Sequence, residues 1–193
     1  MRVLVIPEDS RRDKDLLKPL VEALLANLGK PRAKVRVCEK PVLGGVSRAL
    51  DVTRVKEIVD LWGGQTDLFL LLVDRDGPEN AGRREALTSI EHQISPLLRD
   101  GQALLGEHAI EEVEVWVLAG LDLPSDWSFR DIRRHPHPKE AYFVPYLTEH
   151  RKLGEDAVGR GVVAEEAARS VDRICALCVE DFRRLRDRLQ ALL

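Results

Sequence analysis

The stretch "DLFLLLVDRDG", residues 67–77, decides how this chain folds. Its run from Leu68 to Val73 is entirely apolar, and a run of that kind is typical of a strand buried on both faces inside a parallel sheet. Asp74 and Asp76 follow at once, and Gly77 marks a turn. The stretch therefore predicts a buried strand that ends in an acidic turn.

The remainder of the chain alternates strands with helices. Short apolar or β-branched segments predict strands at residues 2–6, at 33–38 near a sheet edge, and at 103–110, where a helix from Glu111 follows. Apolar residues at helical spacing predict helices over residues 11–27, 46–62 and 83–98, and one or two more over 163–193. This order predicts an α/β fold with a Rossmann-like, mostly parallel sheet, helices on both faces and a helical C-terminal extension.

Composition sets the broad class of the protein. A chain of 193 residues, 44% hydrophobic and 33% charged, suits one folded domain. We predict a core over residues 1–125, with residues 126–193 packed on it as a loop and helical extension. Three cysteines favour a reducing, cytoplasmic setting, and no apolar run approaches the roughly 20 residues that cross a bilayer. The net charge of -3 gives no general attraction to nucleic acid, although a local basic stretch could still form a face that binds it.

Acidic residues follow two of the predicted strands. Glu8 stands just past the first strand, and Asp74 and Asp76 follow the third. If these strands are neighbours, all three carboxylates meet at the carboxyl edge of the sheet, where such folds bind ligands; in an extended chain the two aspartates also project to the same side. Their repulsion would be offset by Mg²⁺ or Mn²⁺, which bind carboxylate oxygens. A second D-x-D, Asp13 and Asp15, lies in a predicted helix and is interpreted as a charged first turn.

This pattern resembles a known family. A strand ending in glutamate, a helix, and a later apolar strand ending in D-x-D are similar to the TOPRIM domain of topoisomerases, primases and OLD-type nucleases, over about residues 1–120. The likeness is sharper for small stand-alone bacterial relatives of the OLD nucleases, whose pattern includes an acidic helix ending in tryptophan and small apolar residues. Here that stretch is "EEVEVWVLAG", residues 111–120.

The resemblance assigns roles residue by residue. Glu8 matches the family's first glutamate, Asp74 and Asp76 its D-x-D pair, and Glu114 the acid two places before the tryptophan. Asp13 matches the acid of the first helix, although it lies one place later than usual.

A second departure follows Glu8, where Asp9 replaces a glycine that would allow close backbone approach. The departure puts tight phosphate contact at that loop in question.

What the resemblance implies is metal-dependent cleavage of phosphodiester bonds in DNA or RNA. Glu8, Asp74 and Asp76 would be catalytic ligands of Mg²⁺ or Mn²⁺, and Glu114 or Asp13 would help to hold a second ion. Nearby basic side chains would position phosphates; the candidates are Arg11, Arg12, Lys14, Arg75, Arg83 and Arg84.

Two other functions stay open. A non-catalytic TOPRIM-like interaction module, acting in a bacterial defence or repair system with a protein partner or as a homodimer, would keep the fold and some of the acids. The sequence "VDRDG" also resembles the first motif of haloacid-dehalogenase-like phosphatases, in which Asp74 would be the nucleophile. Against the phosphatase, Pro78 and Glu79 follow the motif and few strands remain after it.

Overall fold

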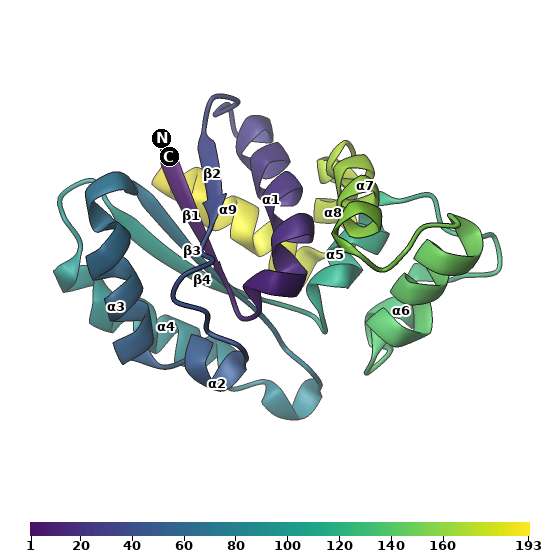
Figure 1. The fold of residues 1–193 in the computed structure, drawn as a ribbon, viewed down its shortest axis with the longest axis horizontal. Helices are drawn as coiled ribbons and strands as arrows, with labels where there is room; N and C mark the ends of the chain where they lie inside the picture. Colours follow the sequence, from purple (N-terminus) through teal and green to yellow (C-terminus); the bar gives the residue numbers. More distant parts are fainter.

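The computed structural model describes all residues, 1–193. The chain forms one four-stranded sheet in the order β2-β1-β3-β4, and every neighbouring pair is parallel. Helices lie on both faces of the sheet (Figure 1). The predicted α/β class with a Rossmann-like parallel sheet and a helical C-terminal part is confirmed. The strands are β1 (Arg2–Pro7), β2 (Lys34–Val37), β3 (Leu68–Asp74) and β4 (Ala103–Ala109).

The apolar strand β3 lies between β1 and β4. All its residues from Leu68 to Val73 are buried, because strands pair with both of its edges and helices cover both of its faces. Pro7 of β1 pairs with Leu72, and Asp74 pairs with Ala109 of β4. This register brings the residue that follows β1 beside the acidic end of β3.

Alternate side chains of β3 enter two different cores. Leu68, Leu70 and Leu72 belong to the larger core, which is completed by α1 (Ser10–Asn27), α5 (Val113–Gly120), α7 (Ala157–Ala168) and α8 (Val171–Leu177). Phe69, Leu71 and Val73 belong to the smaller core under α2 (Val46–Ala49), α3 (Val52–Trp62) and α4 (Arg83–Ile94). The alternation follows from the two-residue period of a strand.

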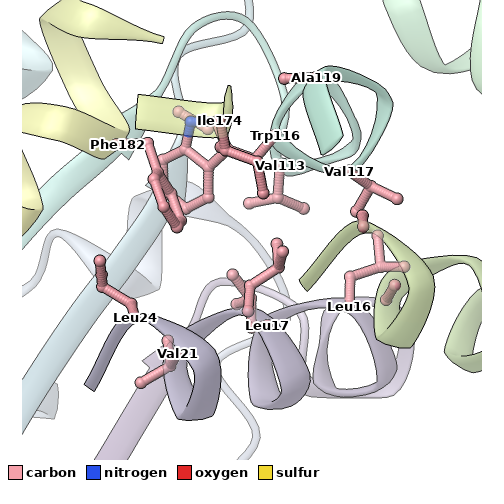
Figure 2. Close-up of a cluster of buried hydrophobic side chains, with 14 of the residues drawn as sticks. Leu16, Leu17, Val21, Leu24, Val113, Trp116, Val117, Ala119, Ile174 and Phe182 are labelled. Carbon is pink, nitrogen blue, oxygen red and sulfur yellow. The ribbon is translucent and has the colours of Figure 1, made fainter. Parts of the chain in front are cut away.

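The larger core joins the first helix to the helix that follows β4. Figure 2 shows Leu17 and Val21 of α1 on the side facing Trp116 of α5. Trp116 is fully buried, and its ring packs edge-to-face on Phe182 at 5.2 Å between centroids. Packing of this kind fixes α5 against α1 and thereby fixes the polar residues at the first turns of both helices.

Some helix boundaries differ from the sequence prediction. The helix predicted over 46–62 is two helices, because Asp51 accepts a hydrogen bond from the Thr53 backbone N–H and so caps a new helix. The helix predicted over 83–98 ends at Ile94, and a 3₁₀ turn containing Pro96 follows over Ser95–Leu97. The helix expected from Glu111 begins at Val113.

The C-terminal region also has more helices than expected. The one or two helices predicted over 163–193 are three: α7 begins earlier, at Ala157, and α8 and α9 (Arg184–Leu192) follow. A short helix α6 (Phe129–Arg134) precedes them. None of the chain's helices has the length and apolar character needed to span a membrane.

Buried Asp181 ties the C-terminal region to the sheet. Its carboxylate accepts hydrogen bonds from the Ile110 backbone N–H at 2.9 Å and from Trp116 Nε1 at 2.8 Å. It also forms an ion pair with Arg133 of α6, with a shortest distance of 2.6 Å. The buried charge is therefore paired and fully hydrogen-bonded, as a charge in a core must be.

A candidate acidic site at the carboxyl end of the sheet

Glu8 and Asp74 meet where β1 and β3 end. Oε2 of Glu8 accepts a hydrogen bond from the Asp74 backbone N–H at 3.3 Å. Oδ1 of Asp74 accepts one from the backbone N–H of Val113, the first residue of α5, at 2.8 Å. The prediction that Glu8 lies beside the acidic end of the third strand is therefore right, and the first turn of α5 joins it there.

Two further carboxylates enter from the helices. Asp13 in the first turn of α1 is only 6% exposed, and Glu114 in the first turn of α5 is only 1% exposed. Oδ2 of Asp13 accepts a weak hydrogen bond from the Asp9 backbone N–H at 3.3 Å. The interpretation of Asp13 as part of an ordinary charged first turn is thus incomplete, because its side chain points into the protein. We call Glu8, Asp13, Asp74, Asp76 and Glu114 the acidic cluster.

Burial and mutual repulsion perturb these carboxylates. Burial, and then the charge of Glu114, raise the pKa of Asp13 to about 7. The pKa of Asp74 lies well above its ordinary value, because the side chain is buried and Glu114, Asp13 and Glu8 are close by. Burial followed by the charge of Asp76 also raises the pKa of Glu8. Ionisation of these groups therefore costs the fold stability, and carboxyls with raised pKa values are common at functional sites.

Asp76 does not continue the line of the strand. Its backbone has a φ of 48°, in the left-handed region, so the expectation that Asp74 and Asp76 project to one side of an extended chain is wrong. Asp76 is nearly half exposed and forms an ion pair with Arg83 at 2.8 Å. Arg83 also donates a hydrogen bond to the backbone carbonyl of Asp74. Asp76 consequently stands at the solvent side of the cluster, near Glu8.

The residue after Glu8 has a local structural task. Oδ1 of Asp9 accepts a hydrogen bond from the Arg11 backbone N–H at 3.0 Å and caps α1. The φ of Asp9 is −128°, which any residue adopts. The backbone here does not need the glycine that the resemblance expects, and a capping aspartate stabilises the helix start instead.

Two cations that the sequence did not single out contact Glu114. Arg160 of α7 places Nη2 at 2.9 Å from Oε1 of Glu114, and Lys139 places Nζ at 3.3 Å from the same oxygen. Both lie far along the chain from the acidic motifs, and no local pattern marks them. Only the packing of α7 against α1 and α5 brings Arg160 to this place.

The basic residues expected from the sequence have mixed positions. Arg83 contacts the acidic cluster, as described above. Arg75 instead pairs with Glu111, and Arg84 lies 3.8 Å from Glu107, away from the cluster. Arg11 and Arg12 line an open hollow of about 650 Å³ beside α7.

The hollow adjoins the acidic cluster through its walls. Lys139 and Arg160, which contact Glu114, line it together with Arg11 and Arg12. Four acidic side chains also line it, so its overall charge is balanced; they are Asp15, Glu140, Glu155 and Asp156. Lys139 and Arg160 thus lie between the hollow and Glu114.

The cluster is not a preformed metal centre. No three Asp, Glu, His or Cys side chains already surround one ion position. Carboxylates would have to rotate to hold an ion. Hard oxygen donors nevertheless suit Mg²⁺ and Mn²⁺ in kind, and Glu8, Asp74, Asp76 and Asp13 supply them.

Comparison with protein-family models, with curated proteins and with solved structures finds no match to this chain. The TOPRIM resemblance thus remains a prediction carried by the residues themselves.

Proposed function

We propose that this protein is a divalent-metal-dependent nuclease that hydrolyses phosphodiester bonds in DNA or RNA. The observation that carries the proposal is the gathering of five carboxylates in the acidic cluster, three of which, Glu8, Asp13 and Asp74, have raised pKa values. Basic side chains contact only two of the five: Arg83 pairs with Asp76, and Lys139 and Arg160 pair with Glu114. Buried like charges are costly unless a cation neutralises them.

The donor chemistry supports Mg²⁺ or Mn²⁺ as that cation. Glu8 and Asp74 are linked by a hydrogen bond at the strand ends, and Asp76 stands beside them at the solvent side. These three are the best candidates for ligands, with Asp13 behind them. When bound, such an ion supplies Lewis-acid stabilisation of charge at a phosphate and lowers the pKa of water.

The chain's own cations would then position the substrate. Arg83 lies beside Asp76 at the solvent side of the cluster, where a phosphate could approach. Lys139 and Arg160 stand between Glu114 and the hollow. Contacts to phosphate oxygens fix the register of a nucleic acid without reading its sequence, so this arrangement favours a polynucleotide backbone over a particular base.

A non-catalytic interaction module is the second candidate. Ion pairs already neutralise Glu114, and no ion position is preformed. Both facts suit a protein that kept the acids for structure alone. Metal binding separates the two functions, because the module needs none.

The test combines metal binding with cleavage. We expect calorimetry to show Mn²⁺ binding to the parent protein, and the parent to cleave labelled single- or double-stranded DNA or RNA in Mg²⁺ or Mn²⁺. Glu8→Gln should lower the cleavage rate by about 100-fold or more. Asp60→Asn, an exposed change on α3, should change neither the Mn²⁺ affinity nor the cleavage rate. Equal Mn²⁺ binding by the parent and by Asp74→Asn would refute the proposal. Turnover of a small phosphate ester with phosphate trapped on Asp74 would instead identify a phosphatase.

A further inference from the structure

A recess of about 170 Å³ lies at the amino end of the sheet, opposite the acidic cluster. It is found where the strands β1 and β2 begin and where α3 ends. No acidic side chain lines it, but three cationic ones do: Arg2, Lys34 and Arg36. Its lining also includes Trp62, Gln65 and Thr66. The recess therefore combines positive charge with polar groups, and the proposed nuclease activity makes no use of it.

The strand register gathers the three cations. Arg2 of β1 pairs with Lys34 of β2, and Leu4 pairs with Arg36. Residues two apart on a strand share a face, so Lys34 and Arg36 stand on the face from which Leu4 enters the smaller core. Val35 between them points the other way, into the larger core. Because β2 is an edge strand, the two cations lie at an open corner of the sheet.

Two of the cations have no carboxylate partner. Arg2 is paired, because its backbone N–H and its Nη2 donate to the two oxygens of Asp67 at 2.7 Å and 2.8 Å. Lys34 forms no ion pair, and Arg36 makes one weak hydrogen bond, from Nη1 to Oε1 of Gln65 at 3.5 Å. Cations held side by side repel each other, and an anion between them would replace that repulsion with attraction.

The wall beside the cations is fixed by hydrogen bonds. Gln102 donates from Nε2 to the carbonyls of Gly63 and Thr66, at 2.6 Å and 2.7 Å. These two bonds hold the 3₁₀ turn that connects α3 with β3. Trp62 donates from Nε1 to the Lys40 carbonyl at 3.1 Å, which sets the orientation of its ring. A wall that is already ordered lowers the entropy cost of binding a ligand.

We propose that this recess binds one phosphate group as a dianion, either free or as a monoester of a small molecule. Lys34 and Arg36 would bind its oxygens, since both side chains make charge-assisted hydrogen bonds to phosphate. The recess is smaller than the roughly 300–1,000 Å³ of pockets that enclose larger ligands, so only the phosphate group would lie inside. This site is at the other end of the sheet from the acidic cluster, and it does not depend on the proposed function.

Phosphate titration of metal-free protein, followed by nuclear magnetic resonance, tests the site. The chain has three tryptophans, and Trp62→Phe identifies the indole N–H signal of Trp62. We expect inorganic phosphate to shift this signal saturably and to leave that of fully buried Trp116 in place. Lys34→Gln and Arg36→Gln, both exposed changes on β2, should each weaken binding about tenfold or more. Lys56→Gln, exposed on α3, is the matched charge control and should bind phosphate as the parent does.

Further ligands separate the sources of the phosphate. Tighter binding of glycerol 3-phosphate than of inorganic phosphate would identify an ester as the ligand, and the reverse order would identify free phosphate. Dimethyl phosphate carries a single negative charge, and binding of it as tight as that of inorganic phosphate would overturn the assignment to a dianion. Equal phosphate affinity in the parent, Lys34→Gln and Arg36→Gln would overturn the role of the two cations. Without a saturable shift at Trp62 the site itself would be wrong, while the proposed nuclease would be unaffected.

Discussion

Replacement of Asp13 by asparagine should stabilise the metal-free protein in a pH-dependent way. Burial and the charge of Glu114 raise the pKa of Asp13 from 3.8 to about 7. A carboxyl whose pKa is raised on folding contributes stability below its unfolded pKa and loses it as pH rises through the folded pKa. At about 1.4 kcal/mol for each unit by which the pKa is raised, the free energy of unfolding lost at pH 8 amounts to at most about 4 kcal/mol. Asparagine has a similar shape and no proton to lose.

The assay is urea unfolding in the presence of a chelator, at pH 5 and at pH 8. Relative to the parent, Asp13→Asn should gain up to about 4 kcal/mol in the free energy of unfolding at pH 8 and less than half of that at pH 5. Asp60→Asn, an exposed change, is the control and should show no such pH dependence. A free-energy difference between Asp13→Asn and the parent that is the same at both pH values would refute the argument that Asp13 is held ionised at a cost.

Three more predictions follow from the geometry. Mn²⁺ should bind the parent more tightly as pH rises from 5.5 to 8 in calorimetry, because Glu8, Asp13 and Asp74, whose pKa values are raised, must lose protons to become ligands; a pH-independent affinity would contradict their role. Asp181→Ala should lower the free energy of unfolding in urea by about 3–5 kcal/mol, because Arg133 loses its buried partner and the Ile110 N–H and Trp116 Nε1 lose their acceptor. Exposed Asp187→Ala should lower it by under about 1 kcal/mol. Gly120→Ala should lower the free energy of unfolding by about 1–3 kcal/mol, since its Cβ would lie 2.6 Å from the Ala167 carbonyl oxygen. Gly161→Ala in α7, where a Cβ would meet nothing within 4 Å, should raise it by about 0.5–1 kcal/mol. Equal effects of the two changes would refute the close approach of α5 and α7.

The framework of the fold follows from local patterns in the sequence. A six-residue apolar run without alternation can be buried only where both faces of a strand are covered, so the run from Leu68 to Val73 indicates the interior of a sheet. The carboxyl ends of parallel strands share one edge, so Glu8 and Asp74 could be expected to meet once β1 and β3 were neighbours. Helix boundaries are harder to predict from the sequence, because a capping residue such as Asp51 starts a new helix within a continuous pattern of apolar residues.

The balance of charge at the site depends on long-range packing. Periodicity shows which side of a helix is buried, but it does not show which distant side chain a buried charge will meet. Asp13 and Glu114 are driven inward because the apolar faces of α1 and α5 pack together around Trp116. Lys139 and Arg160 reach Glu114 only through the docking of chain segments that follow α5. Their contacts are long-range and electrostatic, and no local pattern in the chain encodes them.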